Sequence, residues 1–169
     1  CEQQVLFYDD FSRVDYSGWL MPLGAWKITS GAFVQTYSRG RAIAVVRQSA
    51  VQNCVFSADV KISSKGQSGL VFRYKDTKNY YCFYQTTGGA RLAKYVNGKT
   101  KYLTALHDGL FMPDQTYKFT VKAQGGMLEC FIDDTAVFRV ADTTFSSGKA
   151  GLYSYYNGAA VFDEVLVEQ

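Results

Sequence analysis

Short apolar and aromatic segments alternate with turn residues along the whole chain. Each segment is rich in β-branched or aromatic residues and is bounded by Gly, Asn, Asp or Ser, which is typical of β-strands. No long window shows the period of about 3.6 residues that an amphipathic helix needs. The segments that we expect to form strands are VLFY, AWKIT, AFVQTY, AIAVVRQ, CVFSADVKI, GLVFRY, YYCFYQ, RLAKYV, KYLTAL, TYKFTVKA, MLECFI, AVFRV, AGLYSYY and AAVFDEVLVE.

Turn residues between these segments indicate local hairpins. The stretch VNGK, from Val96 to Lys99, contains the Asn-Gly pair of a tight hairpin, and QGGM and TGGA supply glycines for positive φ. Many short strands, turns about every 8 to 12 residues and no crossover helices predict two antiparallel sheets packed face to face. We therefore expect an all-β fold, a two-sheet β-sandwich of the jelly-roll type, in one domain over residues 1–169.

Alternation along a strand predicts which side chains fill the interior of this sandwich. In CVFSADVKI the apolar residues Phe56, Ala58, Val60 and Ile62 occupy every second position, and Ser, Asp and Lys occupy the positions between them. This strand should therefore have one dry face and one wet face.

The segment GLVFRYKDTKNYYCFYQ differs, because its polar face is also aromatic. A hairpin closed over KDTKN has two registers one residue apart, and a slip between them exchanges the two faces. We favour Tyr81 and Phe83 in the interior, since Phe belongs in a core more readily than Tyr. This register leaves Tyr80 and Tyr84 on the open face, together with Arg73.

Partly exposed tyrosines beside arginine and amide groups are the residues that sugar recognition needs. The apolar face of a sugar ring stacks on an aromatic ring, and planar polar groups bind its hydroxyls. The alternative for any single tyrosine is that its ring covers the sheet and its hydroxyl lies in water. The candidate saccharide-binding residues are Arg73, Tyr84, Arg91, Tyr95 and Tyr155, with Asn157 nearby and Trp19 near a rim.

Composition and charge restrict the class of partner. Hydrophobic residues make up 47% of the chain, which predicts a packed globular core. The net charge is only +3, and the basic residues form no run, so nucleic acid is not an expected partner. No apolar run reaches the roughly 20 residues that span a bilayer.

The four cysteines are widely spaced, without the CxxC spacing of a zinc site. Cys54 and Cys130 lie among apolar strand residues, where free thiols behave as small hydrophobes; a Cys82–Cys130 or Cys54–Cys82 disulfide is the alternative. Cys1, followed by a polar EQQ, is typical of a processed bacterial lipoprotein, and the alternative is a chain boundary that falls on Cys by chance. We expect a secreted or cell-envelope protein, with membrane attachment only through a lipid on Cys1.

Catalytic patterns are weaker. A glycosidase needs two carboxylates that flank the scissile bond, but the acids here are dispersed. The lone His107 lies in a predicted loop. An enzyme would require two or more of Asp59, Glu129, Asp133 and His107 to meet in one cleft.

The order of the motifs DDFS, GW, AWKITSGAFVQ, FSADVKI, SGLVFRYKDTKNYYCFYQ, KYVNGK, YKFTVKAQGGMLECFID and GKAGLYSYYNGAAVFDEVLVE resembles the concanavalin A-like lectin and glucanase superfamily. The resemblance is greatest to the laminin-G-like and fructan-binding modules of bacterial glycoside hydrolases, and it covers nearly the whole chain. The Glu-x-Asp-x-x-Glu motif of the catalytic relatives has no counterpart here, which argues against glucanase activity. Ligands of binding relatives lie on the concave face or at loop tips.

Both ends of the chain carry Asp residues, in FYDDF and VFDEVLV, that suit calcium if the terminal strands lie side by side. The resemblance implies a structural calcium held by backbone oxygens of Asp10 and Gly31 and by the side chain of Asp163, with Asp9 as the fallback for Asp10. We therefore expect a non-catalytic module that binds a poly- or oligosaccharide. The alternatives are a glycoside hydrolase or lyase of the same superfamily and a protein-binding laminin-G-like adhesion domain.

Overall fold

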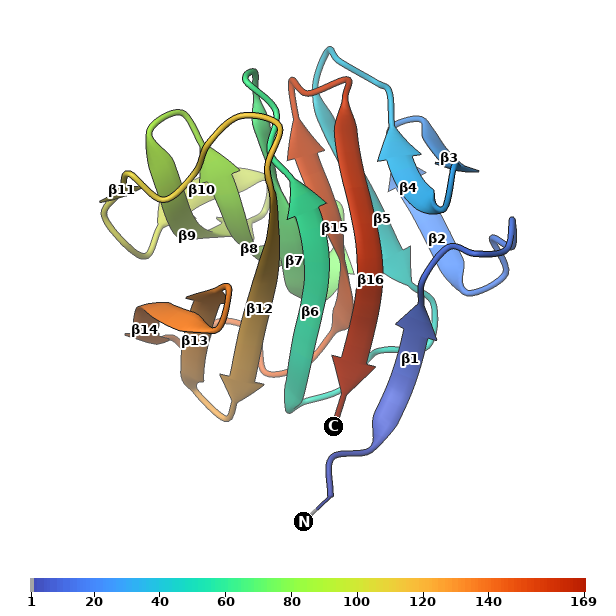
Figure 1. The fold of residues 1–169 in the computed structure, drawn as a ribbon. Helices are drawn as coiled ribbons and strands as arrows, with labels where there is room; N and C mark the ends of the chain where they lie inside the picture. Colours follow the sequence, from blue (N-terminus) through green and yellow to red (C-terminus); the bar gives the residue numbers. More distant parts are fainter. Residues whose placement is uncertain (1) are drawn as a thin grey trace.

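A computed structural model describes residues 2–169 of the chain. These residues form two antiparallel sheets of eight strands each, packed face to face (Figure 1). Sheet A contains β1 (Val5–Asp9), β3 (Trp26–Thr29), β4 (Ala32–Gln35), β6 (Cys54–Lys61), β12 (Thr116–Gln124), β13 (Met127–Ile132), β14 (Thr135–Ala141) and β16 (Ala160–Glu168). Sheet B contains β2 (Trp19–Leu23), β5 (Arg41–Val46), β7 (Gln67–Asp76), β8 (Asn79–Thr86), β9 (Gly89–Val96), β10 (Lys99–Tyr102), β11 (His107–Asp108) and β15 (Lys149–Tyr155).

The strand order within each sheet follows the jelly-roll arrangement. Sheet A runs β14-β13-β12-β6-β16-β4-β3, with β1 beside β16, and sheet B runs β10-β9-β8-β7-β15-β5-β2, with β11 beside β9. The predicted all-β jelly-roll sandwich is thus confirmed. No helix long and apolar enough to cross a membrane occurs among residues 2–169.

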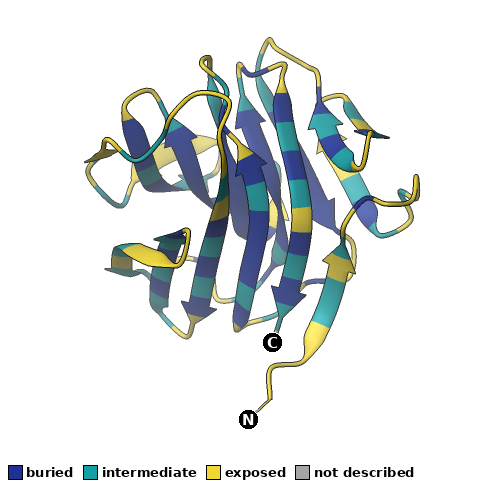
Figure 2. Ribbon diagram, in the orientation of Figure 1, coloured by how far each residue is buried: buried dark blue, intermediate teal, exposed yellow. Residues whose placement is uncertain are grey.

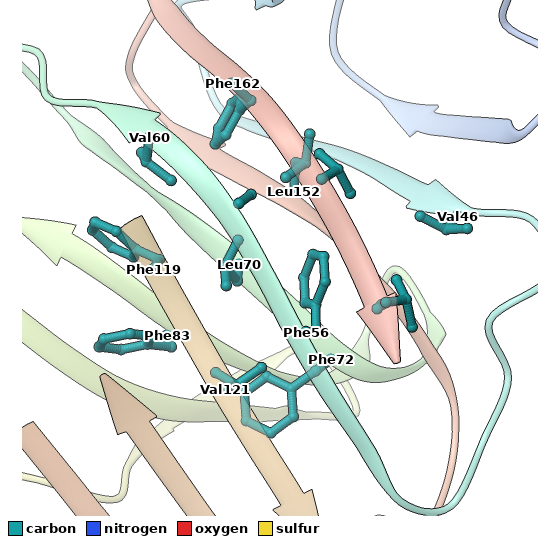
Figure 3. Packing of buried hydrophobic residues seen from close by; sticks show 14 of the residues in the cluster. Val46, Phe56, Val60, Leu70, Phe72, Phe83, Phe119, Val121, Leu152 and Phe162 are labelled. Atoms are coloured by element: carbon teal, nitrogen blue, oxygen red, sulfur yellow. The ribbon is translucent and has the colours of Figure 1, made fainter. Parts of the chain in front are cut away.

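The interior lies between the two sheets. Phe56 and Phe119 of sheet A face Leu70 and Phe83 of sheet B, as Figure 3 shows, and all four are fully buried. Burial varies along β6, visible as bands in Figure 2, and alternates except at Ser57, which is buried although the pattern predicts it on the wet face. The expected interior position of Phe56, Ala58, Val60 and Ile62 is confirmed, since each is at most 3% exposed.

The structure also tests the predicted Asn-Gly hairpin and the predicted state of the strand cysteines. Asn97 and Gly98 have φ of 51° and 78° in the β9–β10 hairpin, as a tight Asn-Gly turn requires. Cys54, Cys82 and Cys130 are all buried and free, so the alternative of a disulfide among them is wrong. The lipoprotein expectation at Cys1 lies outside the described residues.

The β7–β8 register determines what lies on each face of sheet B. Leu70 pairs with Phe83 and Phe72 with Tyr81, and these side chains belong to the interior cluster. The register that we favoured is therefore confirmed. Tyr80 and Tyr84 project from the opposite, outer face of the sheet.

Candidate functional site

The outer face of sheet B carries a second apolar cluster, separate from the interior. We call its six tyrosines and the residues between them the tyrosine face. Cross-strand pairing builds it, because Tyr80 lies opposite Tyr95 and Tyr84 lies opposite Arg91. The six tyrosines are Tyr74, Tyr80, Tyr84, Tyr95, Tyr153 and Tyr155.

The tyrosine face is concave, as the contacts of Arg41 on β5 show. Its Nη1 donates to the hydroxyl of Tyr80 on β8 at 2.7 Å, and its guanidinium carbon lies 5.0 Å from the ring centre of Tyr95 on β9. Strands β15 and β7 separate β5 from β8 in the sheet. Because side chains stand roughly perpendicular to a sheet, these contacts require the sheet to curve toward its outer face.

Only part of this face is accessible. Tyr80 is completely buried, since its ring stacks between neighbours: the ring centres of Tyr80 and Tyr95 are 4.9 Å apart, and Tyr74 stacks at 6.0 Å. Tyr84 and Tyr153 are also buried and pack against each other. Burial raises the pKa of the Tyr84 hydroxyl well above its usual range, so it stays protonated even in alkaline solution.

The accessible rings lie around this buried floor. Tyr95 and Tyr155 are half-buried, and Tyr102 on β10 is 58% exposed. Tyr102 pairs with Ala93 and so lies on the same face as Tyr95. Of the tyrosines predicted to stack on sugar, Tyr95 and Tyr155 therefore offer accessible surface, whereas Tyr84 belongs to the floor.

Arg91 and Arg41 supply positive charge at this face. The guanidinium carbon of Arg91 lies 4.1 Å from the ring centre of Tyr102, and its buried Nε has no hydrogen-bond partner. Arg41 donates from Nη1 to the Thr77 carbonyl as well as to Tyr80. Within residues 2–169, neither arginine forms an ion pair with an acidic side chain.

Arg73 is not part of the tyrosine face, and this prediction is corrected. A β-bulge after Phe72 gives Arg73 a φ of 46°, which redirects its side chain. The side chain is 2% exposed and donates to the backbone carbonyls of Gln52, Gly125 and Phe145. Arg73 thus binds three chain segments together at one end of the sandwich.

Two further expected neighbours of the site are also buried elsewhere. Trp19 is 1% exposed, packs with the interior cluster and donates from its indole to Asp9, so it is not at a rim. Asn157 is buried in the turn after β15, where its Oδ1 accepts the amide of Ala159. Both side chains are buried and therefore offer no surface to a ligand.

Two hollows adjoin the tyrosine face on the β2–β5 side. The first hollow, of about 430 Å³, is lined by Arg41 and the exposed Tyr37. The second, of about 400 Å³, is lined by Tyr74 and Lys149. Both volumes fall in the range of roughly 300–1,000 Å³ that is common for ligand sites. The remaining lining residues are Pro22, Leu23, Gly24, Ala25 and Gly40 for the first hollow and Leu20, Met21, Pro22, Val45 and Lys75 for the second.

The residues considered for catalysis are dispersed between the two sheets. Asp59 and Glu129 lie on β6 and β13 of sheet A, and Asp133 follows β13. His107 lies on β11 of sheet B, where its ring packs edge-on against Phe138. None of these four residues lines either of the two hollows described above.

The three residues expected to bind calcium are brought close by the topology of sheet A. Strand β1 ends at Asp9, which pairs with Val165, and Phe162 pairs with Phe33 just after the β3–β4 turn that contains Gly31. Extending each of these pairings by one or two residues places Asp10 and Gly31 beside β16, close to the bulge that begins at Asp163. Among residues 2–169 no group of three or more His, Cys, Asp or Glu side chains is arranged to hold a metal.

The lack of such a side-chain group among residues 2–169 does not test the predicted calcium site, because that site uses two backbone oxygens and one carboxylate. Partial burial raises the pKa of Asp163, and the charges of Glu164, Asp10 and Asp9 raise it further. Oxygen ligands and uncompensated negative charge are what a calcium ion requires. The residues present therefore fit such an ion.

Comparison with known proteins identifies the family. The model of the 3-keto-alpha-glucoside-1,2-lyase-like domain matches residues 4–168. The chain belongs to this family. Membership in this lyase-like family makes the chain a carbohydrate-related domain. A search of curated proteins gave no match.

Solved structures support the same fold. The carbohydrate-binding module CBM66 from Bacillus subtilis superposes with a TM-score of 0.80 at 23% identity, covering 90% of this chain and 96% of that module. A Bacillus subtilis protein of unknown function with a galectin-like fold gives 0.79 at 15% identity, covering 100% and 97%. The endo-1,3-beta-glucanase (laminarinase) catalytic domain from Thermotoga petrophila gives 0.70 at 9% identity, covering 99% and 98%. The concanavalin A-like fold that the sequence resemblance implies is thus confirmed.

Sequence reasoning missed Arg41 and Tyr102 as members of the site. Tyr102 could have been found, because the Asn-Gly hairpin places it opposite Ala93, two residues from Tyr95 on the same face. Arg41 could not, since its contacts join strands that are distant in both sequence and sheet order.

Proposed function

We propose that this domain binds a poly- or oligosaccharide on the tyrosine face without cleaving it. The observation that carries the proposal is the concave surface on which accessible rings of Tyr95, Tyr102 and Tyr155 surround a buried aromatic floor. Exposed aromatic rings can stack on the apolar face of a sugar, and Arg41 and Arg91 can donate to its hydroxyls.

The lack of a carboxylate pair on the tyrosine face supports binding in preference to glycoside hydrolysis. The outward positions of β2, β5, β7, β8, β9, β10 and β15 on the tyrosine face carry no pair of carboxylates across which a glycosidic bond could lie. The solved structure with the highest TM-score among those described above is itself named a carbohydrate-binding module. We place the domain in the extracellular or cell-envelope space, where polysaccharide ligands occur.

A glycan array with the purified domain tests this proposal. We expect specific signals for a small set of poly- or oligosaccharides, and retention of the same saccharides unchanged after prolonged incubation. A broad array without any signal would contradict the proposal.

The second candidate is a lyase or hydrolase, which the family name favours. Mass spectrometry of saccharides incubated with the domain separates the two functions. Cleavage or elimination products that depend on the folded domain would establish the enzymatic function instead.

We further propose that calcium stabilises the fold at the Asp10, Gly31 and Asp163 positions. Calcium at about ten times its dissociation constant should stabilise the native state by about 1.4 kcal/mol, which raises the melting temperature by about 3–5 °C. Differential scanning fluorimetry in calcium and in chelator measures this shift. Asp163→Asn should abolish it, whereas Asp108→Asn, on exposed strand β11, should leave it unchanged; an identical response in both variants would refute the assignment.

A further inference from the structure

The two outer faces of the sandwich distribute charge differently. On sheet A, opposite charges are neighbours across strands: Lys118 pairs in register with Asp59, and Lys122 with Glu129. Such neighbours partly neutralise each other. Sheet A therefore presents a surface of mixed charge.

The outer face of sheet B carries cations without such partners. Arg41, Arg91 and Lys149 project from β5, β9 and β15, and their cross-strand neighbours on this face are tyrosines. Two acids lie at the margins of the sheet. Asp76 accepts hydrogen bonds within the β7–β8 hairpin, and Asp108 lies on the edge strand β11. Within residues 2–169, none of these three cations forms an ion pair with an acidic side chain.

The ion pairs of the domain confirm this imbalance. The two within residues 2–169 join Lys94 to Asp142 and Lys118 to Asp134, and neither involves a cation of the tyrosine face. Arg41 is instead bonded to a carbonyl and a hydroxyl, and the buried Nε of Arg91 has no acceptor. Partly dehydrated guanidinium groups beside aromatic rings attract anions more strongly than fully hydrated ones.

We propose that the saccharide bound on the tyrosine face is anionic, with carboxylate or sulfate groups that pair with Arg41 and Arg91. This inference rests on the proposed function and specifies its ligand class. A guanidinium binds either anion through two parallel N–H···O hydrogen bonds, which are stronger than hydrogen bonds to a neutral hydroxyl. The aromatic rings meanwhile contact the apolar face of the sugar.

The positions of the remaining cations indicate a polymer with repeated charges. Lys149 and Lys75 line the hollow of about 400 Å³ beside Tyr74, on the same outer face as Arg41. A chain that occupies this hollow and the centre of the tyrosine face would meet positive charge in both places. A single charged sugar unit would meet only one of them.

Matched pairs of polysaccharides test the proposal by isothermal titration calorimetry. Dextran sulfate is compared with dextran, and polygalacturonate with its methyl ester, so that only the charge differs within each pair. We expect the charged member of at least one pair to bind at least ten-fold more tightly, and its affinity to fall as salt is raised. The pair that responds distinguishes sulfate from carboxylate.

Single-residue variants show which face of the domain binds the charged polysaccharide. Arg91→Gln should weaken binding of the charged polysaccharide about ten-fold or more, because a charge-assisted contact is lost. Lys61→Gln changes the net charge equally on the exposed outer face of sheet A and should have no effect. Equal losses in both variants would show non-specific attraction and overturn the proposal, as would equal affinity for a single-stranded oligonucleotide.

The outcomes also separate this inference from the proposed function. If neutral polysaccharides bind as tightly as charged ones and Arg91→Gln has no effect, the ligand class is wrong while saccharide binding holds. If no saccharide of either kind binds, both are wrong.

Discussion

Replacing Arg73 with alanine should destabilise the domain by about 3–5 kcal/mol. The side chain is 2% exposed and satisfies backbone carbonyls of Gln52, Gly125 and Phe145 at 2.7–2.9 Å. An unsatisfied buried polar group costs about 1–3 kcal/mol, and three would be left. A hollow of about 350 Å³ beside Arg73 lets water reach some of them, which favours the lower end of that range.

Urea denaturation at neutral pH measures this loss. Arg139→Ala is the control, because Arg139 is exposed on β14 and its removal should change stability by no more than about 0.5 kcal/mol. Arg73→Lys should fall between Arg73→Ala and the parent, since an ammonium group retains some of the donors. If Arg73→Ala costs less than about 1 kcal/mol, the guanidinium does not hold these segments together.

Tyr102→Ala should weaken saccharide binding about thirty-fold or more. Tyrosines that act as binding hot spots contribute about 2 kcal/mol or more, and this corresponds to that factor. Tyr102 is 58% exposed and packs on Arg91, so truncation removes ring surface and leaves the guanidinium less well oriented. Because the ring lies outside the interior cluster, the fold should persist.

Calorimetric titration of the best ligand from the glycan array measures this effect. Tyr8→Ala is the matched control: Tyr8 is 51% exposed but lies on β1 of sheet A. Its removal should leave affinity unchanged. Equal affinity of Tyr102→Ala and the parent would move the ligand away from the β9–β10 side of the tyrosine face.

The sandwich could be predicted from the sequence because its signals are local. Alternation along β6 identified the dry face from Phe56 to Ile62, and Asn97-Gly98 identified a hairpin. The choice of Tyr81 and Phe83 as interior residues also followed from side-chain polarity alone. Each of these features depends on residues within one strand or one turn.

The site was less predictable because its geometry is not local. The bulge at Arg73 breaks the alternation that was used to place this residue on the open face. The curvature of sheet B brings Arg41 to Tyr80 and Tyr95 across strands that sequence order does not connect. Tyr84 is buried while Tyr155 remains partly accessible, a difference that alternation along the strands does not predict.

The central claim is that a saccharide occupies the concave tyrosine face. NMR titration of the tyrosine ring signals, with the saccharide that binds most tightly on the glycan array, tests it most directly. The account predicts saturable shifts of Tyr95, Tyr102 and Tyr155, while Tyr8 and Tyr117, which belong to sheet A, stay unchanged. Shifts confined to Tyr8 and Tyr117 would contradict it and place the binding site on the opposite sheet.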